Sequence, residues 1–136
     1  MTTRLVCDAS ALVALLLDDG PDGRWAAETL AGAALSAPSL LPFECANIIR
    51  RMELAGLIGS DQAAQAHTDL LDLRVEEWPH ALLAARAWDL RRNLSTYDAS
   101  YVALAELLGT PLVTLDRRLS RAPGLRCSVA SPPRRR

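Results

Sequence analysis

The stretch Leu5-Val6-Cys7-Asp8-Ala9-Ser10-Ala11-Leu12 decides the fold of this chain. A short apolar run leads into a carboxylate, and apolar residues with helical spacing follow at once. This pattern predicts a buried strand over residues 4–8 and a helix packed against it over residues 9–17. In a parallel sheet such a strand ends at the carboxyl edge, where ligands bind, so we expect Asp8 to lie at that edge.

Short apolar runs and helical segments alternate along the rest of the chain. Further strands are expected at residues 35–37, 75–78, 111–115 and 125–129. Helices are expected at residues 25–34, from an N-cap at Ser39 to Gly56, and at residues 60–73, 79–90 and 95–109. This alternation is typical of a three-layer α/β fold, in which helices flank a mostly parallel central sheet. We expect one domain over residues 1–130 and a mobile, Arg-rich tail over residues 131–136.

The composition narrows the class of protein. The 136 residues carry a net charge of -1, and all fifteen basic residues are Arg. The three cysteines have no C-x-x-C spacing, which argues against a zinc cluster or a disulfide framework and favours a reducing cytoplasm. The apolar run at residues 9–17 is too short for a membrane span, and the first residues do not resemble a secretory signal.

Carboxylates from separate parts of the chain are expected at one edge of the sheet. Asp8 and Asp116 each end a strand, whereas Glu44 and Asp98 each lie in the opening turn of a helix. Strand carboxyl ends and the amino ends of the following helices lie at the same edge. Each acid also has a structural interpretation, as a helix cap or a favourable charge at a helix dipole, and Ser95-x-x-Asp98 matches a capping box.

Together the acids predict a metal site. Carboxylates crowded into one crevice repel each other, and a divalent cation relieves that repulsion. Oxygen ligands of this kind suit Mg²⁺ or Mn²⁺. Ser10 and Thr114 could support the site by orienting a carboxylate or water, although Thr114 is equally explained as an ordinary strand residue.

At this point the sequence resembles PIN-domain nucleases, and more narrowly the VapC-type ribonuclease toxins of toxin–antitoxin pairs. The resemblance runs from Arg4 to about Val129 and is carried by Glu44 and by three segments, which are Val6-Cys7-Asp8-Ala9-Ser10-Ala11-Leu12, Tyr97-Asp98-Ala99-Ser100-Tyr101-Val102-Ala103-Leu104-Ala105 and Gly109-Thr110-Pro111-Leu112-Val113-Thr114-Leu115-Asp116.

The resemblance implies a Rossmann-like sheet and an endoribonuclease that depends on Mg²⁺ or Mn²⁺. It also implies homodimers, a cognate antitoxin that blocks the site, and products with a 5′-phosphate and a 3′-hydroxyl. Carried over position by position, the catalytic and metal-binding residues are Asp8, Glu44, Asp98 and Asp116. We expect Asp8 and Asp98 to bind metal directly.

RNA binding is expected from arginines around the crevice. The candidates are Arg117 and Arg118, which follow Asp116, and Arg91 and Arg92, which precede Asp98. Guanidinium groups suit phosphate contacts, but a solvated helix face would explain each of these residues as well.

Other functions compete with a ribonuclease. One is another metal-dependent phosphoryl hydrolase. A haloacid-dehalogenase-type phosphatase would need a second Asp at position 10, which is Ser, and a receiver-like domain would need a Lys after the late strand. A catalytically weak RNA- or protein-binding PIN module is the alternative outside enzymes.

Overall fold

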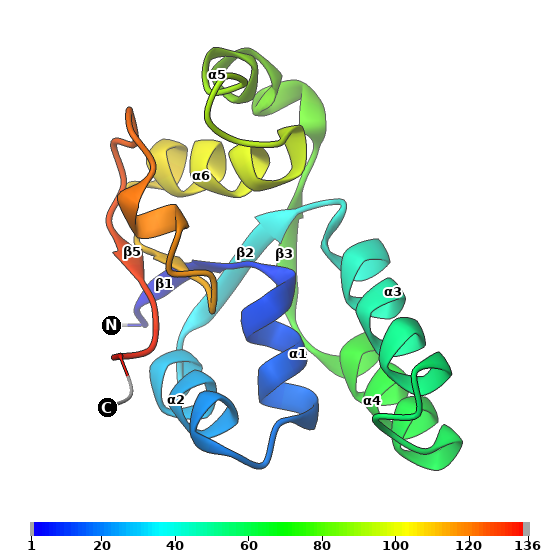
Figure 1. The fold of residues 1–136 in the computed structure, drawn as a ribbon. Coiled ribbons are helices and arrows are strands. Elements are labelled where there is room, and N and C mark those ends of the chain that lie inside the picture. The colour runs from blue at the N-terminus through cyan, green and yellow to red at the C-terminus, as the bar shows by residue number, and fades with distance from the viewer. Residues whose placement is uncertain (1, 135–136) are drawn as a thin grey trace.

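The computed structural model describes residues 2–134 and shows a five-stranded parallel sheet between two layers of helices (Figure 1). The strands have the order β3-β2-β1-β4-β5. They are β1 (Arg4–Cys7), β2 (Ala34–Pro38), β3 (Val75–Trp78), β4 (Leu112–Val113) and β5 (Val129–Ala130). The predicted three-layer α/β fold with a parallel sheet is confirmed.

The helices lie on both faces of the sheet (Figure 1). One layer holds α1 (Ala9–Leu17), α2 (Pro21–Leu30), α3 (Leu41–Leu54) and α4 (Ser60–Asp72). The other face is covered by α6 (Thr96–Leu108), and α5 (Ala84–Asp89) packs on the outer side of α6 (Figure 1). The 3₁₀ turns η1 (His80–Leu82) and η2 (Leu119–Arg121) join the later elements. None of the helices described combines the length and apolar character that a membrane span requires.

The core forms where α1 and α6 cover the central strands. Every residue of α6 from Ala99 to Ala105 is buried, and it contacts β1, β2 and β4. Ala99 and Ala103 are among these buried residues. Gly109 ends α6 in the left-handed conformation at φ 65°, which a residue with a Cβ rarely adopts.

Successive strands are added first on one side of β1 and then on the other. From β1 the chain proceeds to β2 and β3 on one side, and only later to β4 and β5 on the other. The boundary between β1 and β4 is therefore the topological switch point, where α/β proteins form their ligand crevices. In the register Cys7 pairs with Val113, and the Asp8 N–H donates to the Val113 carbonyl at 3.1 Å.

Some predicted boundaries are wrong. The segment expected to be one helix over residues 79–90 is a 3₁₀ turn followed by the short α5. The last strand is Val129–Ala130 rather than residues 125–129. Ser39 does not cap α3, because Leu40 occupies the N-cap position without a side-chain hydrogen bond. Pro42 in the first turn lacks an N–H that would need a partner, so this helix can begin without a polar cap.

We predict that Leu104→Ala lowers the free energy of unfolding by about 2–5 kcal/mol, because the substitution leaves a cavity under α6 where Leu104 is fully buried. Urea denaturation at neutral pH measures the loss. Leu107→Ala on the same helix is the matched control, since Leu107 is 56% exposed and its truncation should cost about 0.5 kcal/mol or less. Equal losses for the two variants would contradict the assignment of Leu104 to the core.

Candidate active site

Asp8 is buried at the end of β1 and forms the N-cap of α1. Its Oδ1 accepts hydrogen bonds from the Ser10 hydroxyl at 2.6 Å and from the Ala11 N–H at 3.1 Å. Its Oδ2 accepts from the Thr114 hydroxyl. Burial raises the pKa of Asp8, and these hydrogen bonds offset only part of that increase. Asp8 is therefore a helix cap and, at the same time, a buried carboxylate that is costly to ionise.

Two hydroxyls connect Asp8 to the end of β4. Thr114 is fully buried, and its Oγ1 also accepts from the Asp116 N–H at 3.0 Å. The Ser10 Oγ accepts from the Leu115 N–H at 3.0 Å. The structure thus places both predicted supporting residues on Asp8, and the Thr114 hydroxyl has a specific partner beyond its role as a strand residue.

Glu44 lies in the first turn of α3 and reaches across to α6. Its Oε1 accepts a hydrogen bond of 2.6 Å from the hydroxyl of Tyr101, which is almost entirely buried. Burial raises the pKa of Glu44, and repulsion from Asp98 and Asp8 adds to the increase. The sequence predicted Tyr101 only as an inward-facing residue. Its spacing from Asp98, one helical turn, was the available sign that its hydroxyl could reach the acidic edge.

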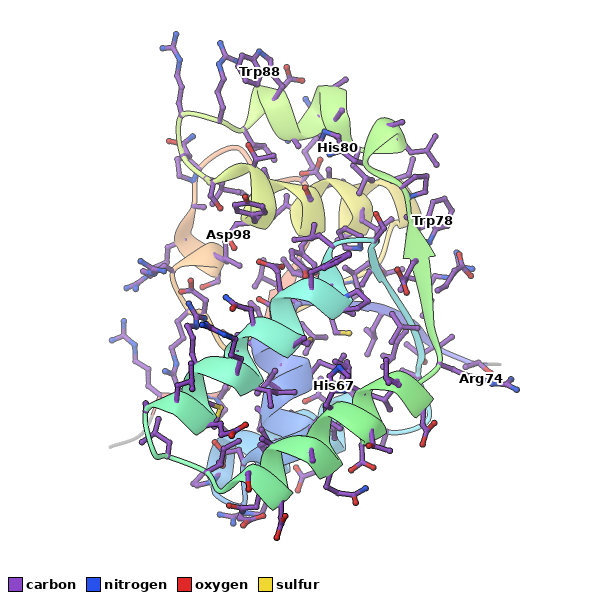
Figure 2. All side chains as sticks on the ribbon, turned by 90° about the vertical axis from the view of Figure 1, so that its right-hand side faces the viewer. His67, Arg74, Trp78, His80, Trp88 and Asp98 are labelled. Atoms are coloured by element: carbon purple, nitrogen blue, oxygen red, sulfur yellow. The ribbon has the colours of Figure 1, made fainter. Side chains whose placement is uncertain are left out.

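Asp98 lies in the first turn of α6, and Figure 2 shows it near the N-terminal end of this helix. Its N–H donates to the Ser95 hydroxyl at 3.1 Å, so Ser95 is the N-cap that the capping-box pattern predicted. Burial raises the pKa of Asp98, and the negative charge of Asp116 raises it further.

Asp116 differs from the other acids because an arginine holds it. Arg118 donates from Nε to Oδ1 at 3.0 Å and from Nη2 to Oδ2 at 2.8 Å. The Arg118 N–H donates to the same Oδ1 at 3.0 Å. These contacts lower the pKa of Asp116. Asp116 and Asp98, together with Arg118, line a crevice of about 290 Å³.

The charge of each predicted acid affects the pKa of at least one other or is affected by it. Asp98 repels both Asp8 and Glu44, and Asp116 repels Asp98. Within residues 2–134, however, no group of three or more Asp, Glu, His or Cys side chains is arranged so that it could bind one metal ion. Carboxylate oxygens suit a hard cation such as Mg²⁺. Asp116 is hydrogen-bonded to Arg118, however, and Glu44 to Tyr101. These two side chains would have to reorient to share a cation with the others.

The predicted RNA-binding arginines lie in three different surroundings. Arg118 lines the acidic crevice. Arg117 donates to the carbonyls of Pro132 and Pro133 at 3.1 and 3.0 Å. Arg91 lies 4.7 Å above the Trp88 ring and donates to the Trp88 carbonyl, and its neighbour Arg92 is exposed. An RNA-binding role for each of them stays a prediction.

Comparisons with known proteins define the family. A model of the PIN domain matches residues 5–125. The chain is 40% identical over 130 residues to the VapC ribonuclease Mb0985 of Mycobacterium bovis, covering 96% of this chain and 99% of that protein.

Solved structures agree in fold. The crystal structure of PAE2754 from Pyrobaculum aerophilum matches with a TM-score of 0.68 and 25% identity, over 93% of this chain and 83% of that one. VapBC2 from Rickettsia felis, bound to a DNA fragment from its promoter, matches with a TM-score of 0.66 and 15% identity, over 95% of this chain and 98% of that one.

The chain therefore belongs to the PIN domain family. Within that family it belongs with the VapC ribonucleases, as the near full-length match shows. The resemblance seen in the sequence is confirmed. The assignment of individual catalytic residues stays a prediction.

We predict that Thr114→Val lowers the free energy of unfolding by about 1–3 kcal/mol, because the buried Asp8 carboxylate loses a donor and the Asp116 N–H loses its acceptor. Urea denaturation at pH 7.5 in the presence of EDTA measures this loss. Thr114→Ser keeps the hydroxyl and serves as the control. A Ser variant that is destabilised as much as the Val variant would assign the effect to the lost methyl group instead.

We predict that Asp98→Asn raises the Tm at pH 7.5 in EDTA. The pKa of Asp98 in the folded protein lies above its ordinary value of 3.8, so the folded state retains its proton to higher pH than the unfolded state. Stability therefore falls as the pH rises from about 4 through the folded-state pKa, and this loss is complete above it. The amide removes the loss.

The gain in Tm should disappear at about pH 3 and below, where the carboxyl group is protonated in both states. Asp72→Asn at the exposed end of α4 is the control, and its Tm should stay close to that of the wild type at every pH. A lower Tm for Asp98→Asn at pH 7.5 would show that the acidic edge stabilises the metal-free fold.

Proposed function

We propose that this protein is a Mg²⁺- or Mn²⁺-dependent endoribonuclease and the toxin of a toxin–antitoxin pair. The proposal is supported by Asp8 and Asp116, which Thr114 links at the switch point between β1 and β4, and by Asp98, whose charge raises the pKa of Asp8 and Glu44. The near full-length similarity to a VapC ribonuclease supports the same activity.

The unfavourable charge of Asp8, Glu44 and Asp98 indicates what these acids bind. Burial and mutual repulsion raise the pKa of Asp8, Glu44 and Asp98. Carboxylates in this state gain from a bound divalent cation, and they would repel an RNA phosphate without one. When bound, Mg²⁺ or Mn²⁺ would supply phosphate binding and a water of lowered pKa.

Asp8 and Asp98 are the proposed direct ligands, with Glu44 and Asp116 binding directly or through water. Asp8 is held in one rotamer by Ser10, Ala11 and Thr114, so its position is fixed before any ligand arrives. One carboxylate of the group accepts the proton of the attacking water. Cleavage leaves a 5′-phosphate and a 3′-hydroxyl.

Arg118 is the proposed phosphate-binding residue of the crevice itself. Its side chain is 82% exposed, and it lies beside both Asp116 and Asp98. A guanidinium group can exchange a carboxylate partner for a phosphate of similar geometry. Arg118 is thereby placed to hold Asp116 in the free protein and RNA in the complex.

The proposed partners are a cognate antitoxin, which blocks the acidic crevice, and a second copy of this chain in a homodimer. The similarity to the VapBC2 complex of Rickettsia felis supports the antitoxin. The protein is expected to act in the cytoplasm, where its RNA substrate lies.

We predict that Asp8→Asn lowers Mg²⁺-dependent RNA cleavage by at least about 100-fold while the fold persists, because the amide removes a buried charge needed to bind the cation. Cleavage of a labelled RNA, with and without EDTA, measures the loss, and the product ends identify the reaction. Mg²⁺ should raise the Tm of the wild type, and Asp8→Asn should weaken that response.

Asp72→Asn is again the control and should cleave like the wild type. Expression of the wild type should arrest growth, and co-expression of a protein encoded beside it should relieve the arrest. Full cleavage by pure Asp8→Asn would refute the catalytic assignment. RNA binding by the wild type without cleavage would instead indicate a catalytically weak binding module.

A further inference from the structure

A second, strongly basic pocket lies outside the acidic crevice. It has a volume of about 500 Å³ and is lined by Arg117, Arg121, Arg134 and Asp22. These residues come from the segment after β4, from the C-terminal segment and from the first turn of α2. Three guanidinium groups and one carboxylate give the lining a net positive charge, which favours an anion.

Hydrogen bonds from Arg117 to the C-terminal segment hold the pocket together. Arg117 donates from Nε to the Pro132 carbonyl at 3.1 Å and from Nη2 to the Pro133 carbonyl at 3.0 Å. Pro132 is buried. Arg117 thus fixes the course of the chain just before Arg134, and this brings the Arg134 side chain into the lining.

Spare hydrogen-bonding capacity remains in the pocket. A guanidinium group has five N–H donors, and the two contacts to the proline carbonyls use only two of those of Arg117. Arg121 and Arg134 are both exposed to solvent. The pocket can therefore offer several donors to an incoming phosphate without breaking the contacts that build it.

The basic pocket adjoins the acidic crevice. Arg117 directly follows Asp116, and Arg121 lies in η2, whose first residue Leu119 lines the crevice. The charge of Arg121 also reaches Asp116 and lowers its pKa. An extended polyanion bound at Arg118 in the crevice could therefore also contact the basic pocket.

The chemistry of the lining favours a nucleic-acid backbone as the ligand. Guanidinium groups bind phosphates through paired, charge-assisted hydrogen bonds. The four lining residues include no aromatic side chain on which a base could stack. Contacts of this kind hold the backbone and do not read the sequence.

We propose that Arg117, Arg121 and Arg134 form a binding site for RNA phosphates that flank the scissile bond, so that the C-terminal segment is part of the substrate site. This inference rests on the proposed ribonuclease function. It assigns to Arg121 and Arg134 a role in substrate binding, and it assigns to Arg117 the additional role of positioning the C-terminal segment.

The test measures RNA binding separately from cleavage. All variants are made in the Asp8→Asn background, and their affinity for a labelled single-stranded 15-nucleotide oligouridylate is measured by fluorescence anisotropy at a fixed Mg²⁺ concentration and several NaCl concentrations. Arg121→Glu and Arg134→Glu carry the test. Arg117 is left unchanged, because its substitution would also release the C-terminal segment.

Arg74→Glu is the matched control. It changes the net charge by the same amount at an exposed position, and Figure 2 shows Arg74 on the other side of the molecule from Asp98. We expect Arg121→Glu and Arg134→Glu each to weaken binding about tenfold relative to Arg74→Glu. The slope of log K against log salt should fall by about 0.7 for each RNA phosphate that a variant no longer neutralises. Arg121→Lys keeps the charge without the paired donors, so it should lose less affinity than Arg121→Glu.

Equal affinities and salt slopes for Arg121→Glu, Arg134→Glu and Arg74→Glu would overturn the inference, even if the wild type cleaves RNA. Unchanged RNA affinity with weaker binding of poly-L-glutamate would also overturn it and would assign the pocket to an acidic protein segment. Loss of RNA affinity in the two variants would support the site, even if the wild type proved unable to cleave.

Discussion

The parallel pairing of β1 with β4 is the constraint on which the site depends. It sets Cys7 against Val113, so the next residues, Asp8 and Thr114, leave the sheet side by side and join through a hydrogen bond. Asp116 follows two residues later, with its N–H held by the same threonine. A shift of one residue in this register would turn Thr114 to the other face and separate the two ends of the site.

Assembling the acids costs stability in the free protein. Asp8 has a donor on each carboxylate oxygen, yet its pKa remains raised, because hydrogen bonds do not replace all of the lost hydration. Tyr101 and Arg118 each hold one further acid, Glu44 and Asp116. These contacts let the fold tolerate charges that lie close together, and such local destabilisation is common at functional sites.

The arginines show how a single residue type serves several purposes here. Arg118 holds a carboxylate of the crevice, Arg91 covers Trp88, and Arg117 fixes the chain at Pro132 and Pro133. From the sequence all of these residues were candidates for RNA binding, and Arg117 was the preferred one. Each of these arginines has a hydrogen-bond partner within the protein. The partners of Arg117 lie 15 or more residues away along the chain, whereas those of Arg118 and Arg91 lie only two or three residues away.

The sequence by itself determined the fold class, through its alternation of strands and helices, and the family, through its resemblance to PIN-domain nucleases. It predicted four acids at one edge, because strand ends and helix starts in a parallel sheet meet there. It also indicated Ser10 and Thr114 through their spacing from Asp8 and Asp116. Only the tertiary structure decided the contact of Tyr101 with Glu44, the break in the helix after Pro79 and the basic pocket around Arg117, Arg121 and Arg134. The Tyr101 contact and the basic pocket depend on side chains from distant segments that pack together, and sequence spacing alone does not identify those partners.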